Sequence, residues 1–177
     1  MRSSRVALSL LAALSLSAAA FPAAADTHIE LQGGRSYMDS HATNAFFIES
    51  VFNAYPIGAS RFTWSPDVSI GYIKGRDIGR YADSHPGVTN NVWVGAAGAR
   101  LHYGTDGDWY HPFFFSFQVA GTAGGRTQAL SSGYEFVSTL GWQWKYLSFQ
   151  VRHISNGSFK EPNRGETMAL VGIGFDI

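Results

Sequence analysis

A histidine and a serine lie two residues apart near the C-terminal end of the chain, in the segment VRHISNGSFKEPNRGETMAL. Residues at this spacing on a β-strand share one face and lie about 6.5 Å apart along it, so the His153 imidazole can lean toward the Ser155 hydroxyl. A glutamate, Glu166, closes the polar stretch that follows. A nucleophile, a base and an orienting acid can hydrolyse an ester, with Ser155, His153 and Glu166 in these roles.

The same segment also has the features of an ordinary turn. Asn156-Gly157 is a favoured turn dipeptide, Pro162 to Gly165 indicates a second turn, and His-x-Ser is too short to be specific. In the catalytic interpretation, the backbone N–H groups of Asn156 and Gly157 and the side chain of Asn163 are the candidates for binding an oxyanion. Spacing alone leaves both interpretations open, and the choice depends on the face of the strand that these residues occupy.

The N-terminus predicts export. Two arginines, an apolar Ala/Leu/Ser run and Ala23-Ala24-Ala25 have the layout of a signal peptide over residues 1–25, which leaves one domain over 26–177. A membrane-anchoring helix is the alternative, but the apolar run is short and a small-residue cleavage site follows it. Loss of Arg2 and Arg5 with the leader lowers the formal charge from zero to −2. This balance disfavours a nucleic-acid partner.

Composition limits the chemistry further. The chain has no cysteine, so disulfides and thiol catalysis are excluded. The histidines outside the polar segment are spread without metal-ligand spacing, so no metal or cofactor is expected; they are His28, His41, His85, His102 and His111. After Asp26 no segment has a helical period, while aromatic residues are frequent. An all-β fold is therefore predicted.

Apolar residues recur at every second position in eight segments. In YHPFFFSFQVAG, for example, Phe113, Phe115 and Phe117 share one face, opposite Ser116 and Gln118. The predicted strands are 27–36, 43–54, 60–74, 91–103, 112–122, 133–144, 146–155 and 166–177. Each is about the ten residues that a tilted transmembrane strand needs, and eight is an even number. The pattern predicts an eight-stranded antiparallel transmembrane β-barrel.

A soluble lipocalin-like barrel shows the same alternation with its faces reversed. Turn lengths and aromatics favour the membrane barrel: most connections on one side are short, and Tyr55, Trp109, Tyr110, Trp144 and Tyr146 gather near them, as in a periplasmic girdle. A barrel of eight strands is too narrow for an open pore. Arg100, Glu135 and Arg152 fall on the inward face, as a polar plug.

On this barrel His153 and Ser155 face outward, because the apolar face of Leu147, Phe149 and Val151 continues to them. Polar side chains on the lipid-facing surface suggest a membrane substrate. The last strand, in contrast, turns Ala169, Val171, Ile173, Phe175 and Ile177 outward and Glu166 inward. A bulge near Gly165 would repair this, and Glu161 is a weaker substitute acid.

The segment HISNGSFKEPNRGE, with the signal peptide, chain length and eight strands, resembles the lipid A 3-O-deacylase (PagL) family of outer-membrane esterases. The specific positions are His153, Ser155, Asn156, Pro162, Asn163, Gly165 and Glu166. The resemblance implies a bacterial outer-membrane serine esterase that removes the ester-linked 3-hydroxyacyl chain at the 3 position of lipid A in lipopolysaccharide. It gives His153, Ser155 and Glu166 the catalytic roles. In the family pattern one residue stands between the loop glycine and the glutamate, whereas Gly165 and Glu166 are adjacent in this chain.

Cations gather in the predicted external connections, where a basic rim suits the phosphates of lipid A. The substrate-phosphate candidates are Arg76, Arg80, Arg126, Lys160 and Arg164, with Lys74 beside them. Ordinary solvated loop charge explains any one of them equally well. Two rival functions stay open, a non-enzymatic structural or adhesive outer-membrane barrel and a soluble periplasmic lipid-binding barrel. A homodimer also stays open.

Overall fold

The computed structural model describes residues 27–76 and 87–177, and within them the chain forms nine strands. The strands are β1 (His28–Met38), β2 (His41–Val51), β3 (Tyr55–Pro56), β4 (Phe62–Ile73), β5 (Val92–Tyr103), β6 (Phe113–Gly124), β7 (Tyr134–Trp144), β8 (Leu147–Ser155) and β9 (Glu166–Asp176). The predicted signal peptide, His85 and Arg80 lie outside the described residues. No helix in the described ranges is long and apolar enough to cross a membrane.

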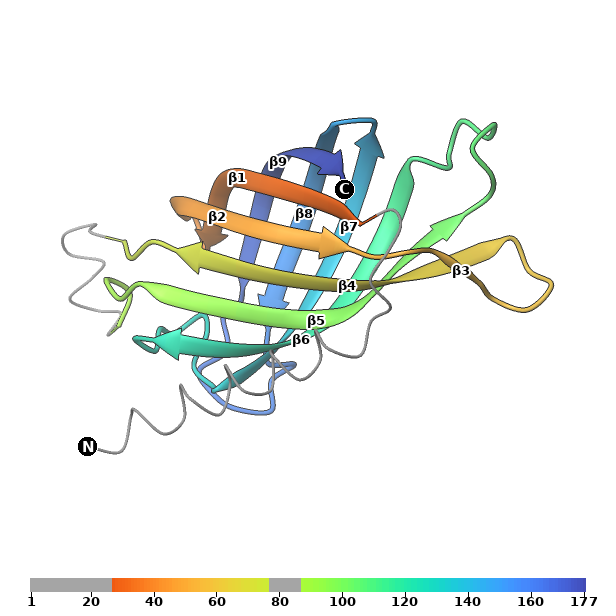
Figure 1. Ribbon diagram of the computed structural model, residues 1–177. Helices are drawn as coiled ribbons and strands as arrows, with labels where there is room; N and C mark the ends of the chain where they lie inside the picture. Colours follow the sequence, from red (N-terminus) through yellow and green to blue (C-terminus); the bar gives the residue numbers. More distant parts are fainter. Residues whose placement is uncertain (1–26, 77–86) are drawn as a thin grey trace.

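Eight of the strands close into an antiparallel barrel (Figure 1). Each of β4 to β9 pairs with its neighbour in sequence, β1 pairs with both β2 and β9, and β2 pairs with β4. Closure leaves these strands without a free edge, as a lipid-facing sheet requires. The short β3 pairs only with the start of β4, in a hairpin that projects beyond one end of the barrel. The predicted eight-stranded barrel is confirmed.

Strand boundaries differ little from those predicted. The second connection is longer than expected, because the strand predicted over 43–54 ends at Val51 and β4 begins at Phe62. The first connection, expected over residues 37–42, is a two-residue turn at Asp39 and Ser40. Asp39 has a φ of 53°, a left-handed conformation that aspartate tolerates better than most residues. β1 and β2 therefore extend almost to the turn.

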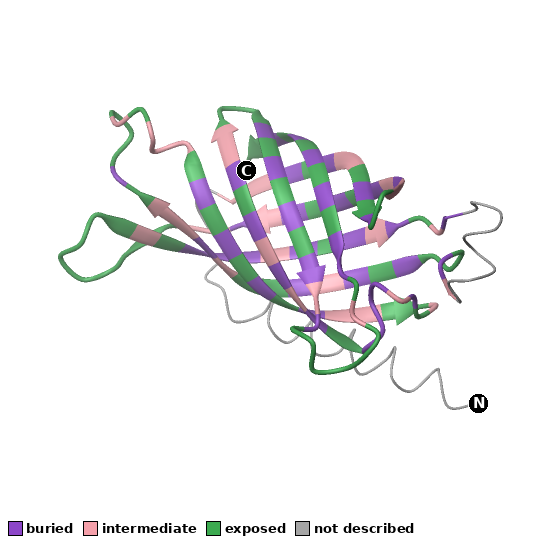
Figure 2. Cartoon of the chain, turned by 180° about the vertical axis from the view of Figure 1, so that it is seen from behind, coloured by how far each residue is buried: buried purple, intermediate pink, exposed green. Residues whose placement is uncertain are grey.

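Buried and exposed residues alternate along the strands, and the exposed set is apolar (Figure 2). The outward side chains include Leu31, Phe46, Ile48, Ile70, Trp93, Phe113, Phe115, Phe117, Val119, Leu140, Phe149, Val151, Val171 and Ile173. A water-soluble barrel would bury this face, whereas a membrane barrel presents it to lipid. The alternation, with apolar side chains outward, is therefore that of a membrane barrel.

The middle of the interior is a polar network. Glu49 accepts hydrogen bonds from Arg152 at 3.1 Å, and Arg100 forms an ion pair with it at 3.2 Å. Arg100 also lies 3.9 Å from the centroid of the Phe114 ring. Buried charges are tolerated only when they are paired in this way. The inward orientation predicted for Arg100, Glu135 and Arg152 is confirmed.

Toward the predicted external end the interior contains an apolar cluster beside its buried polar groups, which the sequence pattern did not indicate. Ile154 and Met168 lie in a buried cluster with Val137, and the loop residues Ala129 and Leu130 join it. The outer half of the barrel is therefore packed like a small hydrophobic core, which makes the ends of β8 and β9 a rigid support.

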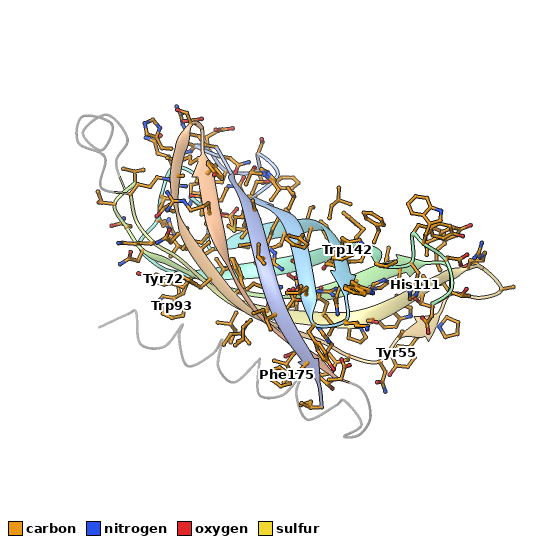
Figure 3. The ribbon with its side chains drawn as sticks, turned by 90° about the horizontal axis from the view of Figure 1, so that it is seen from above. Tyr55, Tyr72, Trp93, His111, Trp142 and Phe175 are labelled. Atoms are coloured by element: carbon orange, nitrogen blue, oxygen red, sulfur yellow. The ribbon has the colours of Figure 1, made fainter. Side chains whose placement is uncertain are left out.

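Aromatic side chains mark both ends of the outer surface (Figure 3). Tyr55 packs on Trp64 at one end, with ring centroids 5.4 Å apart, and Trp109 in the same region is 82% exposed. Tyr72 and Trp93 pack together at the other end, with centroids 5.0 Å apart. Two aromatic belts of this kind flank the apolar band of outer-membrane barrels.

Candidate active site

His153 and Ser155 lie at the end of β8 on the outward face of the barrel. Val151 and His153 are exposed, whereas the next residue, Ile154, is buried. Ser155, the last residue of the strand, is half-buried. The exposed side chain of His153 agrees with the predicted outward face, and Ser155 follows it by the same two-residue period. Both side chains are thus placed where a lipid in the surrounding membrane can reach them.

The His153 ring has a defined orientation. Its Nδ1 lies 2.9 Å from the Thr167 Oγ1, directly across on β9. Its other edge lies over Gly165, where an added Cβ would be 2.7 Å from Cε1 and 3.1 Å from Nε2. The β8–β9 pairing extends to Ile154 and Glu166, so Ser155 and Gly165 are the next residues beyond it along the chain. Within the described residues the Ser155 hydroxyl makes no hydrogen bond.

Glu166 does not reach His153. Its carboxylate is 1% exposed, points into the barrel, and accepts hydrogen bonds from the Arg76 guanidinium at 2.8 and 2.6 Å and from the Ser36 hydroxyl. The β8–β9 ladder is regular up to Glu166, so there is no bulge near Gly165 to turn it outward. The predicted orienting role of Glu166 is wrong for this geometry, because alternation along β9 places it on the face opposite to His153.

Thr167 takes the place beside His153 that was predicted for Glu166. Sequence reasoning missed it, although the signal was present: the outward set Ala169, Val171 and Ile173 continues by the same period to Thr167. Thr167 was not predicted because a catalytic triad is expected to contain a carboxylate.

The three oxyanion candidates differ in burial and in whether their donor groups are free. Asn156 is fully buried; its backbone N–H donates to Asn163 Oδ1 at 3.2 Å, and its side-chain amide donates to Lys160 O at 2.8 Å and Ser131 Oγ at 3.4 Å. Its donors are occupied, so its predicted oxyanion role is wrong for this geometry. Asn163 is half-buried with its carbonyl oxygen toward Asn156, which leaves its amide NH₂ as a donor. Gly157 is exposed.

The β8–β9 loop is held against the β6–β7 connection. The backbone N–H groups of Arg164 and Gly165 donate to the carbonyl oxygens of Gln128 and Ala129, each at 3.2 Å. The exposed Glu161 accepts a hydrogen bond from the backbone of its own loop at 3.2 Å. These contacts fix the backbone beside Ser155 and give Glu161 a structural partner.

A family model described as Lipid A 3-O-deacylase (PagL) matches residues 55–176 of the chain. This span contains β3 to β9 and the outward pair of His153 and Ser155. The chain belongs to this family. It is accordingly an outer-membrane enzyme, a lipid A 3-O-deacylase.

The crystal structure of the outer membrane enzyme PagL has the same fold. It superposes with a TM-score of 0.55 at 17% sequence identity, covering 85% of this chain and 99% of that chain. At this identity the likeness establishes the barrel and not the residues of the site. No curated protein matches the sequence significantly.

The predicted phosphate ligands of the deacylase are only partly at its surface. Arg76 is buried in the barrel, where it binds Glu166, so its predicted contact with substrate phosphate is wrong for this geometry. Arg126 and Lys160 are exposed in the loops, and Arg164 pairs with Asp39 at 2.6 Å. A loop arginine enters the barrel here because a buried carboxylate lies within its reach.

An arginine that was not predicted lies on the outer surface of the deacylase. Arg35 of β1 is exposed, pairs across the sheet with Ala169, and its guanidinium donates to the Asn44 side chain. It lies one outward position below Tyr37, which pairs with Thr167. Outward charges are costly at the middle of a bilayer and cheap near its surface, so Arg35 is suited to the headgroup boundary.

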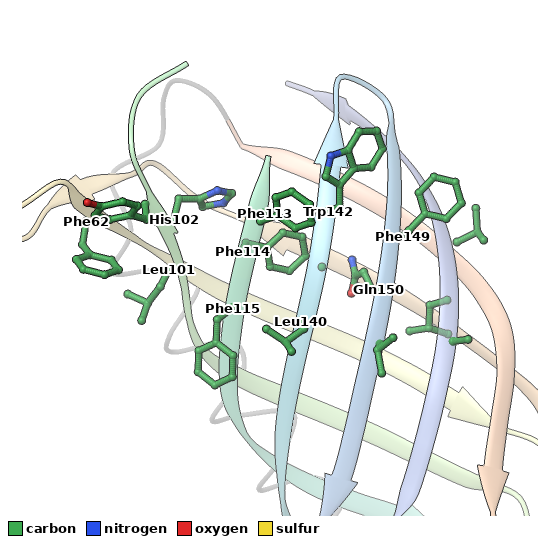
Figure 4. A pocket seen from close by; sticks show the side chains of 16 residues that line it. Phe62, Leu101, His102, Phe113, Phe114, Phe115, Leu140, Trp142, Phe149 and Gln150 are labelled. Carbon is green, nitrogen blue, oxygen red and sulfur yellow. The ribbon is translucent and has the colours of Figure 1, made fainter. Parts of the chain in front are cut away.

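An apolar groove lies on the barrel wall (Figure 4). It has a volume of about 880 Å³ and is lined across β4 to β9 by residues that include Leu101, Phe115, Leu140, Phe149 and Val151. Val151 and Ala169 are cross-strand partners one outward position below His153 and Thr167. The groove therefore begins about 7 Å from the site and continues along the apolar face of the barrel.

Proposed function

We propose that the protein is a serine esterase that hydrolyses the ester-linked 3-hydroxyacyl chain at the 3 position of lipid A in the outer leaflet. The observation that carries this is the outward position of His153 at the end of β8, with Ser155 two residues further along the same strand and the imidazole in contact with Thr167. A buried pair could not meet the ester of a membrane lipid. Catalytic hydrogen bonds are often loose before substrate binds, so the serine and histidine are expected to close on each other in the complex.

In the proposed mechanism Ser155 Oγ attacks the ester carbonyl carbon while its proton passes to His153 Nε2. The tetrahedral intermediate collapses, the bond to the sugar oxygen breaks, and His153 returns the proton to that oxygen. Water then attacks the acyl-enzyme with His153 again as base, which releases the fatty acid and restores the serine. The amide of Asn163 and the backbone N–H of Gly157 are the donors proposed for the oxyanion.

The apolar groove is the proposed site for the acyl chain that is removed. Its first residues, Val151 and Ala169, lie directly below the histidine on the same face. The chains of a lipid whose headgroup lies at the external surface run in this direction, toward the middle of the membrane. Contact with the groove would hold the ester at the serine.

Filling the groove should separate long-chain from short-chain substrates. In Ala169→Trp the indole occupies the groove below the site, and we expect the ratio of kcat/KM for lipid A to kcat/KM for a soluble acetate ester to fall about tenfold. Both rates are measured on the detergent-folded barrel. An unchanged ratio would show that the acyl chain lies elsewhere.

Arg35 is the proposed contact for a phosphate of the substrate. Its long side chain can extend from the apolar surface to the headgroup level and form charge-assisted hydrogen bonds there. Arg35→Gln should lower kcat/KM for phosphorylated lipid A about tenfold and leave the rate on phosphate-free lipid A unchanged. Equal losses on both substrates would reject a phosphate contact, and Lys145→Gln, in the exposed β7–β8 turn at the opposite end of the barrel, serves as the control.

The proposed reaction is tested by incubating the folded protein with lipid A and reading the products by mass spectrometry. The expected result is loss of one 3-hydroxyacyl group with appearance of the free hydroxy acid, and no product from His153→Gln folded in parallel. Release from another position would revise the regiochemistry. Unchanged lipid A with a folded wild-type barrel would favour the structural or adhesive function.

A further inference from the structure

We propose that the Thr167 hydroxyl, and not a carboxylate, orients the His153 imidazole. The inference rests on the proposed esterase function and assigns a positioning residue to the same site. Its basis is the 2.9 Å contact between Thr167 Oγ1 and His153 Nδ1, made by residues that pair directly across β8 and β9.

The position of Thr167 is fixed by the pairing of β9 with β8. Glu166 is anchored inside the barrel by two hydrogen bonds from Arg76 and one from Ser36. Because successive side chains of a strand point to opposite faces, the inward Glu166 and the outward Thr167 both follow from the alternation along β9. The pairing of β8 with β9 thus decides that Thr167 is the residue that contacts the imidazole.

The surroundings of His153 supply no competing acid. On the outward face the register places Ser138 of β7 on one side of His153 and Thr167 on the other, with Tyr37 of β1 beyond Thr167. Nearby charged side chains are engaged elsewhere: Glu166 and Arg76 pair in the interior, and Arg164 pairs with Asp39 at the rim. Within the described residues His153 forms no ion pair.

A hydroxyl in this position can orient the imidazole, which is one of the two functions of the acid in a triad. By accepting the Nδ1–H it holds the tautomer in which Nε2 carries the lone pair needed to take the Ser155 proton. It carries no negative charge, so it stabilises the imidazolium ion much less than a carboxylate would.

The test compares Thr167→Val, Thr167→Ser and Thr167→Glu with the wild type, as kcat and KM over pH 5 to 10 on lipid A. Valine keeps the shape and loses the hydroxyl, so kcat should fall about tenfold to a hundredfold at unchanged KM, and serine should restore most of it. A glutamate supplies the charge: because a carboxylate favours the imidazolium ion, the acidic limb of the kcat/KM profile should move to higher pH.

Glu166→Gln is the matched control, since it changes the neighbouring carboxylate that faces away from the ring. It should lower the melting temperature of the barrel while kcat per folded molecule stays near the wild-type value. The inference is overturned if Thr167→Val keeps the wild-type kcat. It is also overturned if Glu166→Gln lowers kcat tenfold or more, as expected for Thr167→Val. Either result leaves the esterase itself intact as long as the wild type releases the hydroxy acid and Ser155→Ala does not.

Discussion

Replacing Ser155 with alanine is expected to lower the release of the 3-hydroxy acid from lipid A about a thousandfold or more. The substitution removes one oxygen and leaves the half-buried end of β8 otherwise unchanged. Without the nucleophile no acyl-enzyme forms, and only the slow direct attack of water remains. The rate is measured by mass spectrometry of the products, at equal amounts of folded barrel.

Ser158→Ala provides the matched control. Ser158 is exposed in the same loop, three residues after the proposed nucleophile, and should be replaceable without loss of rate. A fluorophosphonate probe gives an independent readout: it should label the wild type at Ser155 and fail to label Ser155→Ala. A folded Ser155→Ala barrel that still releases the acid at the wild-type rate would exclude the serine mechanism.

Replacing Gly165 with alanine should lower kcat about a hundredfold or more, for two reasons. Gly165 has a φ of 68°, where a residue with a Cβ is strained by about 1–3 kcal/mol. In addition, the new methyl group would lie 2.7 Å from the Cε1 of His153, so the ring has to move. A displaced imidazole loses either its contact with Thr167 or its direction toward Ser155, and small misplacements of a catalytic group are costly.

Gly58→Ala separates these two effects. Gly58 has a similar φ of 56° but lies in the turn after β3, and a Cβ added there meets no atom within 4 Å. Both variants should lose stability, measured as unfolding in denaturant, whereas only Gly165→Ala should lose kcat per folded molecule. Equal kcat in the two variants would mean that the imidazole accommodates a methyl group at Gly165 without being displaced.

The structure also explains why a site exposed to lipid can be well ordered. Ile154 and Met168, next to His153 and Thr167, are buried in the apolar cluster of the outer half of the barrel. On the other side, the loop that follows Ser155 is tied to the β6–β7 connection by backbone hydrogen bonds. The chemistry is thus supported by rigid strands from within the barrel.

Much of the barrel follows from local alternation. A two-residue period is readable along any single strand, so the eight strands, the apolar outer face and the outward direction of His153 and Ser155 could be predicted from the sequence. The same period, applied to the last strand, already placed Glu166 inward. The expectation of a bulge, introduced to restore a familiar triad, replaced a correct local inference with a wrong one.

What only the tertiary structure decided depends on pairing between distant segments. The sequence by itself determined the faces of the strands, but the β8–β9 register decided that Thr167 meets His153, and closure of the barrel brought Arg76 to Glu166. Loop packing likewise buried Asn156 and occupied its donors. Such contacts depend on how separate strands and loops come together in space, and this information is not contained in the periodicity of any one of them.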